Sequence, residues 1–374
     1  MDSLRSACKL VQENQFNEPT YIFHRAVLTR KVEVFKNLQC KILYAVKTNP
    51  EEIVIKHLIN QGVHSFDVAS IGEIELITRL SKELNIDCKM YFMHPVKPRY
   101  AIREAYFNYG IRNFSLDSQH ELEKILEETN HAKDLCLHLR IAVKGNYAKF
   151  KLSEKFGIEI ENAPSLLRRI KQVAFKTGVS FHVGSQCENA NAFKNAIEGV
   201  AKIVNEIPVD TFNIGGGFPS IYPSSNPTHT LEEFFEIIHK SFEKLENKDK
   251  IEFLAEVGRG LVAECMSLIV RVDLRKGEYL YINDGTYGGL FDAGQSVNFI
   301  FPMKLLRESN APMQAFKLYG PTCDSLDYME GSFELPSDIK EGDYIEIMQM
   351  GAYSKAIATS FNGFKPNNEI FEFA

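Results

Sequence analysis

The chain has 374 residues, of which 44% are hydrophobic and 25% charged, and its formal net charge is −6 at neutral pH. This profile is typical of a globular protein of one or two domains, and the negative charge argues against sequence-independent nucleic-acid binding. No apolar run of about 18 residues and no signal peptide are evident, and seven cysteines without CxxC pairs indicate free thiols in the cytoplasm.

Eight apolar segments recur along the first two thirds of the chain, and a polar turn and a helical pattern follow each one. They begin at residues 41, 63, 89, 112, 135, 179, 211 and 252. Near-continuous apolar runs of this kind are typical of parallel strands buried on both faces. The predicted helix starts are Asn49 as N-cap before Pro50, and capping boxes at Ser70–Glu73 and Ser118–Glu121. Eight strand–helix units predict an α/β fold with a closed (β/α)8 barrel, and an open doubly wound sheet is the alternative.

After about residue 265 the pattern changes to strands joined by glycine turns, with no long helix between the last two. The segments that begin at residues 268, 315 and 343 are the predicted strands. We therefore expect a barrel domain over 26–265 and a C-terminal all-β domain over 266–374, completed by residues 1–25. The segment 290–310 is expected to be a loop region.

Four polar side chains fall at the carboxyl ends of predicted barrel strands, where active sites of such barrels lie. They are Lys47, Asp67, His182 and Glu256. Each also has an ordinary explanation, such as a solvated lysine, a helix-entry aspartate or a satisfied core histidine. The run Gly215–Gly217 follows another strand and is either a tight turn or a set of amides that binds phosphate. It lacks the Lys–Ser/Thr ending of a P-loop, which argues against a nucleoside triphosphate.

Two other kinds of site fit the sequence poorly. The segment that starts at Gly258 has the form G-x-G-x-x-A, but a strand resumes near Leu268 and leaves too little chain for a dinucleotide-binding crossover helix. No HExxH or paired Cys/His spacing appears, so no metal is predicted. A lysine, a phosphate cradle and a carboxylate at one barrel mouth are what pyridoxal phosphate requires.

Seven motifs occur in the order and at the intervals of a known family: YAVKTNP, FDVAS, HVGSQ, IGGGFP, EVGRG, YGPTCDSLD and GAYS. The chain resembles the ornithine/diaminopimelate decarboxylases, which are pyridoxal-phosphate enzymes with an alanine-racemase-like barrel and a C-terminal β domain. The match covers nearly the whole chain and is strongest to the ornithine decarboxylases. The resemblance implies decarboxylation of a basic amino acid, with L-ornithine converted to putrescine and carbon dioxide in polyamine biosynthesis as the first expectation.

The resemblance also implies roles at matching positions. Lys47 would bind the cofactor covalently through its amine, His182 would stack on the cofactor ring, and Glu256 would pair with the pyridinium nitrogen. The other cofactor-binding positions that the resemblance implies are Asp67, Glu73, Arg140, Ser185, Gly215, Gly216, Gly217, Gly258, Arg259 and Tyr353.

The substrate end of the site would come from the second subunit of a homodimer, as in the family. Cys323 would return a proton to the substrate carbon after carbon dioxide leaves, and Asp324 would pair with the distal amine. Tyr287 is expected to contribute to the same substrate site.

The sequence departs from the family at one substrate-binding position. Where ornithine decarboxylases carry a Tyr–Asp pair for the distal amine, an ungapped count reaches Gln295 and Ser296. The nearest acid, Asp292, is expected to act from a shifted loop. This departure keeps a lysine or arginine decarboxylase open as alternatives.

Three further alternatives are disfavoured. Diaminopimelate decarboxylases carry a Glu–Ser pair at the positions that Cys323 and Asp324 occupy in this chain. An amino-acid racemase needs a second base, usually a tyrosine, opposite Lys47. A non-catalytic homologue that only binds the cofactor usually lacks the lysine or the cysteine, and this chain has both.

Overall fold

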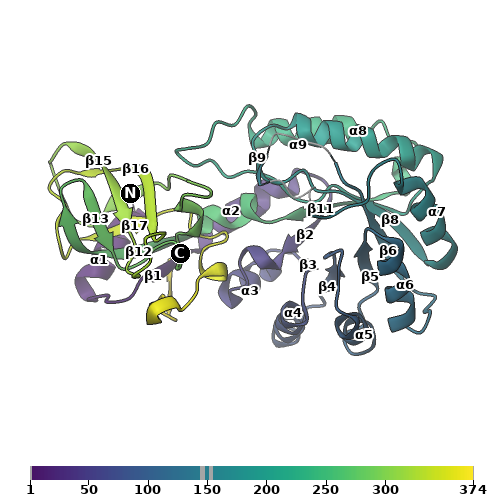
Figure 1. Cartoon of the computed structure of the whole chain (residues 1–374), viewed down its shortest axis with the longest axis horizontal. Helices are drawn as coiled ribbons and strands as arrows, with labels where there is room; N and C mark the ends of the chain where they lie inside the picture. The colour runs from purple at the N-terminus through teal and green to yellow at the C-terminus, as the bar shows by residue number, and fades with distance from the viewer. Residues whose placement is uncertain (1, 144–147, 151–154, 374) are drawn as a thin grey trace. The chain divides into compact units, whose positions relative to one another are not determined.

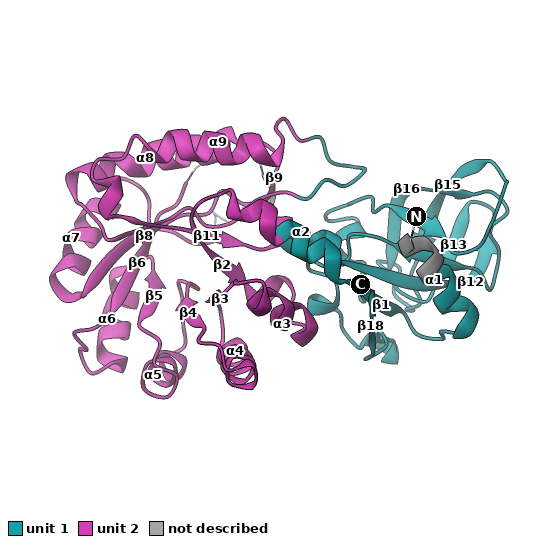
Figure 2. Ribbon diagram, turned by 180° about the vertical axis from the view of Figure 1, so that it is seen from behind, with its two compact units in different colours: residues 1–31, 220–226, 261–374 teal, residues 32–219, 227–260 magenta. Residues whose placement is uncertain are grey.

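The computed structural model describes residues 2–143, 148–150 and 155–373 (Figure 1). The chain forms two compact units, shown in Figure 2. Unit 1 comprises residues 1–31, 220–226 and 261–374, and unit 2 comprises residues 32–219 and 227–260. The domain limits of 26–265, and of 1–25 with 266–374, stay a prediction. None of the helices within the described residues is both long and apolar enough to cross a membrane.

Unit 2 contains a closed barrel of eight parallel strands in the order β10-β11-β2-β3-β4-β5-β6-β8. The strands are β2 (Lys41–Ala45), β3 (Ser65–Val68), β4 (Lys89–Phe92), β5 (Asn113–Leu116), β6 (Cys136–Arg140), β8 (Lys176–Ser180), β10 (Thr211–Asn213) and β11 (Glu252–Val257). The sheet closes because β11 pairs with β2 and β10 pairs with β8. The predicted (β/α)8 barrel is therefore confirmed, and the open sheet is wrong.

Helices follow the barrel strands and surround them in Figure 1. They are α3 (Glu52–Asn60), α4 (Ile71–Leu84), α5 (Arg99–Phe107), α6 (Gln119–Glu128), α7 (Ala163–Val173), α8 (Asn191–Glu206) and α9 (Leu231–Phe242), while α2 (Arg25–Lys36) precedes β2. Each buries an apolar stripe: in α8, for example, Phe193, Ile197, Val200 and Val204 are buried.

The predicted start of α3 is wrong by two residues. The helix begins at Glu52 with Glu51 as its N-cap, and no side chain caps it. Asn49 instead accepts a hydrogen bond on Oδ1 from the backbone N–H of Glu51, at 3.1 Å. This short Asx-type contact stabilises a turn that competes with the helix, so the helix starts after it.

The two predicted capping boxes are only half formed. Ser70 accepts a hydrogen bond from the N–H of Glu73, and Ser118 accepts one from the N–H of Glu121, each at 3.3 Å. The reciprocal carboxylate contacts go elsewhere: Glu73 accepts from the N–H of Ala69 at 2.7 Å, and Glu121 contacts Lys97 at 2.9 Å. Glu73 thus bonds the residue before its N-cap, and only Glu121 is taken over by a tertiary partner.

The barrel interior is filled, so chemistry is confined to the strand ends. Leu43 of β2, Tyr91 of β4, Leu254 of β11 and Met93, directly after β4, form one buried cluster. His138 of β6 is fully buried, and burial lowers its pKa to about 4. It is therefore a neutral core histidine, consistent with a packed barrel rather than a pore.

Unit 1 is built on a largely antiparallel sheet in the order β14-β17-β12-β13-β15-β16, with β1 paired to β12 and β18. The elements are α1 (Asp2–Glu13), β1 (Thr20–His24), β12 (Met266–Lys276), β13 (Tyr279–Ile282), β14 (Met303–Leu305), β15 (Met313–Tyr319), β16 (Tyr328–Pro336), β17 (Tyr344–Ile347) and β18 (Ile370–Phe373). Strand β14 lies inside the expected loop of 290–310. Three residues are too few for a periodic pattern, and pairing with β17 forms this strand.

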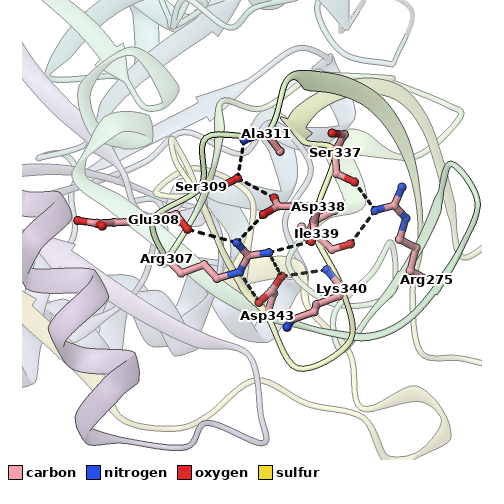
Figure 3. Close-up of polar contacts among 10 residues, drawn as sticks. All are labelled: Arg275, Arg307, Glu308, Ser309, Ala311, Ser337, Asp338, Ile339, Lys340 and Asp343. Atoms are coloured by element: carbon pink, nitrogen blue, oxygen red, sulfur yellow. Dashed lines mark hydrogen bonds and ion pairs between the residues drawn. The ribbon is translucent and has the colours of Figure 1, made fainter.

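A polar network fixes the connection between β16 and β17 (Figure 3). Arg307 donates to both carboxylate oxygens of Asp343, from Nε at 2.8 Å and from Nη2 at 2.9 Å, and it also contacts Asp338 at 3.1 Å. Arg275 donates to the carbonyls of Ser337 and Ile339 at 2.6 and 2.8 Å. Planar guanidinium groups are suited to such multiple contacts, which hold this turn against the sheet.

Candidate functional site

Polar groups at the ends of the barrel strands, seven side chains and one run of glycine amides, lie at its carboxyl-terminal rim, because all eight strands run in one direction. In strand order from β2 they are Lys47, Asp67, His94, Asp117, Arg140, His182, Gly215–Gly217 and Glu256. The rim thus brings together most of the cofactor residues that the sequence predicted in this unit.

Lys47 lies on a short 3-10 turn, Val46–Thr48, that follows β2. Its two neighbours on the turn are buried, whereas 48% of its own side chain is exposed. The ammonium nitrogen donates to Oδ2 of Asp67 at 3.3 Å, and the Asp67 side chain is only 4% exposed. The lysine at the end of an apolar strand is therefore held by a buried carboxylate and still accessible to a ligand.

Glu256 lies within β11 and is 5% exposed. Its Oε1 accepts a hydrogen bond from Nδ2 of Asn213 at 2.8 Å. Burial raises the pKa of Glu256 to about 7, the negative charge of Asp67 adds to the rise, and Arg140 and Lys47 oppose it. A carboxyl group in this state is poised to pair with a cation or a protonated ring nitrogen.

His182 follows β8, and its Nδ1 accepts a hydrogen bond from the N–H of Gly184 at 2.9 Å. Burial lowers the pKa of His182 well below its usual value, and the charges of Arg140 and Lys47 lower it further. The imidazole is therefore neutral, with its proton on Nε2. A neutral ring with a fixed orientation is suited to lie flat on another aromatic ring.

The three glycines after β10 leave no room for side chains. A Cβ atom on Gly215 would lie 2.1 Å from the carbonyl oxygen of Phe181, and one on Gly216 would lie 2.4 Å from that of Glu256. Gly217 has φ of +122°, which residues with a side chain rarely adopt. The bare backbone is therefore required here, and such a turn is a suitable cradle for a phosphate group.

The remaining predicted cofactor residues of unit 2 follow the rim residues closely in sequence. Ser185 begins β9 (Ser185–Cys187), Arg259 is 5% exposed, and a Cβ atom on Gly258 would lie 2.4 Å from Oγ1 of Thr48, next to Lys47. Burial raises the pKa of Glu73 to about 7, and the charge of Asp67 adds to the rise.

Two rim residues were missed from the sequence. His94 lies two residues beyond β4, packs edge-on against Phe156 at 5.2 Å between ring centroids, and has a pKa lowered by burial and by Lys97 and Lys47. Asp117 directly follows β5 and accepts a hydrogen bond from the N–H of Gly157 at 2.9 Å. The signal was available, because both follow apolar runs in the same way as Lys47.

Within unit 1, the structure joins two of the predicted substrate residues. The hydroxyl of Tyr287 donates to Oδ2 of Asp324 at 2.7 Å, and the N–H of Leu326 donates to Oδ1 at 2.9 Å. These two hydrogen bonds, the backbone one first, lower the pKa of Asp324. The adjacent Cys323 is exposed, and its N–H donates to Oδ1 of Asn362 at 3.1 Å.

The positions that depart from the family also lie in unit 1. Gln295 and Ser296 are exposed, whereas Asp292 is buried on a 3-10 turn, Phe291–Ala293. The substrate-binding role of Asp292 stays a prediction. Tyr353, predicted to bind phosphate, also belongs to this unit and has φ of +51°.

The fold and the rim define a barrel of the pyridoxal-phosphate type, and comparison with known proteins agrees. The family model described as "Pyridoxal-dependent decarboxylase, pyridoxal binding domain" matches residues 25–263. Ornithine decarboxylase of Panagrellus redivivus is 31% identical, over 96% of this chain and 86% of the relative. The chain therefore belongs to the pyridoxal-dependent decarboxylases, and its cofactor is pyridoxal phosphate.

Two other similar proteins show how the family varies. Antizyme inhibitor 2 of Xenopus laevis is 31% identical, over 87% of this chain and 74% of the relative. The structure of a lysine/ornithine decarboxylase from Vibrio vulnificus, complexed with putrescine, has a TM-score of 0.84 and 28% identity, covering 100% of this chain and 98% of that one. The relatives thus include decarboxylases of basic amino acids and a protein named as an inhibitor.

The rim residues fit pyridoxal phosphate on their own geometry. A glycine turn without space for a Cβ atom suits the phosphate, a buried carboxyl group with a pKa near 7 suits the ring nitrogen, and Lys47 supplies an accessible amine. The cofactor, when bound, supplies the electron sink of the reaction.

Proposed function

We propose that this chain decarboxylates a basic amino acid, with L-ornithine as substrate and putrescine and carbon dioxide as products. The observation that carries the proposal is the rim of unit 2, where Lys47 contacts Asp67 and their charges act on the buried Glu256. The ornithine decarboxylase relative and the putrescine-bound neighbour support the choice of substrate.

In this proposal the side chains of unit 2 hold and orient the reacting groups. Lys47 would hold the cofactor through its amine, and Asp67, which accepts from the Lys47 ammonium nitrogen at 3.3 Å, would direct the lysine. Glu256 would pair with the ring nitrogen and favour its protonated form, and Asn213 holds the carboxylate through its 2.8 Å contact. His182 would stack on the cofactor ring. The residues of unit 2 proposed to surround the phosphate or frame the pocket are Glu73, Arg140, Ser185, Gly215, Gly216, Gly217, Gly258 and Arg259. Tyr353, which belongs to unit 1, is proposed as a further phosphate ligand.

The substrate end is proposed to come from unit 1 of a second copy of the chain in a homodimer. Asp324 stays ionised because Leu326 and Tyr287 donate to it, so it can bind a distal ammonium group by a charge-assisted hydrogen bond. Cys323 returns a proton to the carbon that lost carbon dioxide. Its thiol is exposed in the single chain, as a donor to an incoming group must be.

The substrate is less strongly specified than the reaction. Gln295 and Ser296 stand where the ornithine decarboxylases place an aspartate, so one charge that selects the distal amine is replaced. Lysine or arginine is therefore the alternative substrate, and the Vibrio vulnificus neighbour is itself named for two substrates. Asp292 is proposed to supply part of the missing charge.

A cofactor-binding regulator without catalysis is the second candidate function, and the 31% identity to antizyme inhibitor 2 favours it. Against it, the chain has both the lysine and the cysteine that the reaction uses. A cytoplasmic location is proposed for either function, supported by the seven free cysteines.

The test combines absorbance with product analysis. Purified protein should absorb in the visible range through its bound cofactor and release carbon dioxide from ornithine, assayed beside lysine, arginine and diaminopimelate. Lys47→Ala should abolish this absorbance, whereas Cys323→Ala should retain it and lose amine product. Cys88→Ala is the matched control and should change neither. Carbon dioxide release at background level with all four amino acids would overturn the proposed decarboxylase function and favour the regulator.

A further inference from the structure

One buried carboxylate in unit 1 joins two separate segments of the chain. Asp327 precedes β16 and is 2% exposed. Its Oδ1 accepts hydrogen bonds from the N–H and hydroxyl of Thr286, at 2.7 and 3.1 Å. Its Oδ2 accepts from the N–H and hydroxyl of Thr322, at 3.0 and 2.8 Å. Four donors from residues far apart in sequence therefore share one side chain.

The two joined segments are those that carry the substrate residues of the proposed reaction. Thr286 directly precedes Tyr287, and Thr322 directly precedes Cys323 and Asp324. The backbone of Asp327 adds to the arrangement, because its N–H donates to the carbonyl of Asp324 at 3.1 Å. Asp327 thus fixes the backbone on both sides of the 2.7 Å contact between Tyr287 and Asp324.

The surroundings are shaped for this carboxylate. A Cβ atom on Gly285 would lie 2.0 Å from Oδ1 of Asp327, and one on Gly320 would lie 2.2 Å from the same oxygen. Both segments therefore approach the carboxylate more closely than any residue with a side chain would allow. An asparagine would fit the same space, but its NH2 group would face N–H donors on one side.

We propose that Asp327 is a positioning residue for the reaction. It sets the backbone beside Tyr287 and beside Cys323 and Asp324, so that the carboxylate for the distal amine and the thiol that returns the proton are held at a fixed separation. Asp327 acts through these residues and does not touch the substrate. The inference rests on the proposed function, which assigns the substrate to Cys323 and Asp324.

The first measurement does not depend on activity. Hydrogen exchange in the peptides 284–290 and 320–328 should be at least tenfold faster in Asp327→Asn than in the unchanged protein. Asp273→Asn, an aspartate of the same unit paired with Arg271 at the surface, should leave both peptides unchanged. Unchanged exchange in Asp327→Asn would overturn the proposal. If that variant does not fold, Thr322→Val removes only the hydroxyl bond and should accelerate exchange in peptide 320–328.

The second measurement asks whether Asp327 acts through Asp324. The ratio of kcat/KM for ornithine to that for 2-aminopentanoic acid, which lacks the distal amine, should fall at least tenfold in Asp327→Asn, with visible absorbance unchanged. In an Asp324→Asn background the same change should cause no further fall. An additive fall would overturn the positioning role. A wild-type protein that releases no carbon dioxide would refute the proposed function alone. The hydrogen-exchange measurement would still test whether Asp327 holds the two segments.

Discussion

Replacing the buried Lys97 tests how the barrel mouth is held together. The ammonium group of Lys97 is 0% exposed and lies between the ends of β4 and β5. It donates to the carbonyls of His94 and Ser115, at 3.0 and 2.5 Å, and contacts the carboxylate of Glu121 at 2.9 Å. Lys97→Met keeps most of the volume and removes every one of these contacts.

The expected loss follows from the burial of both partners. Removing one member of a buried pair typically costs about 3–5 kcal/mol of unfolding free energy, because the other charge stays buried. Lys124 also contacts Glu121, at 2.5 Å, and retains part of the pairing. We therefore expect Lys97→Met to lower the unfolding free energy by about 2–4 kcal/mol in urea denaturation. Lys89→Met, at an exposed position on β4, is the matched control and should change it by less than about 0.5 kcal/mol.

A double variant separates the pair from the remaining contacts. Lys97→Met with Glu121→Leu replaces two charges by apolar groups, which is often neutral for a buried pair. The carbonyls of His94 and Ser115 then lack their donor, and the N–H of Lys97 and the ammonium group of Lys124 lose the Glu121 carboxylate. A deficit of about 1–2 kcal/mol should therefore remain. A double variant that is no more stable than Lys97→Met alone would show that the unpaired charge of Glu121 does not cause the loss.

The same lysine makes a prediction about pH. Burial lowers the pKa of Lys97 to about 8 from the usual 10.5, so the folded protein loses this proton at lower pH than the unfolded chain. The unfolded chain then binds more protons between these values, and this group's contribution to stability rises with pH. The stability difference between the wild type and Lys97→Met should grow by up to about 3 kcal/mol from pH 8 to pH 10.5. A difference that shrinks over this range contradicts the sign.

Three more changes test other parts of the molecule. Gly216→Ala places a Cβ atom 2.4 Å from the carbonyl oxygen of Glu256. We therefore expect the variant to lose the visible cofactor absorbance and about 1–3 kcal/mol of unfolding free energy. Retained absorbance would argue against a phosphate cradle at Gly215–Gly217. Arg307→Lys removes the two-point contact with Asp343, so urea denaturation should show a loss of about 1–2 kcal/mol of unfolding free energy. An unchanged unfolding free energy would mean that other contacts hold the turn. Asp324→Asn should raise the KM for ornithine at least tenfold and leave absorbance intact, and an unaltered KM removes Asp324 from the substrate site.

The barrel and its main site residues could be predicted from the sequence because their signals are local. Apolar runs mark the strands, and parallel strands direct their carboxyl ends to one rim, so the order of residues alone assigns Lys47, Asp67, His182 and Glu256 to that rim. The motifs then connect these residues to pyridoxal phosphate. The same rule, applied to every strand, would have included His94 and Asp117.

The tertiary structure decided which partners these residues meet. The sequence around Lys97 reads as a polar turn, and only the fold brings Glu121 and the carbonyl of Ser115 to its ammonium group. Asp327 and Thr286 are 41 residues apart, and no local sequence pattern predicts their contact. A sequence records periodicity and strand ends along one dimension, whereas a buried charge is stabilised by donors and acceptors that only folding brings within about 3 Å.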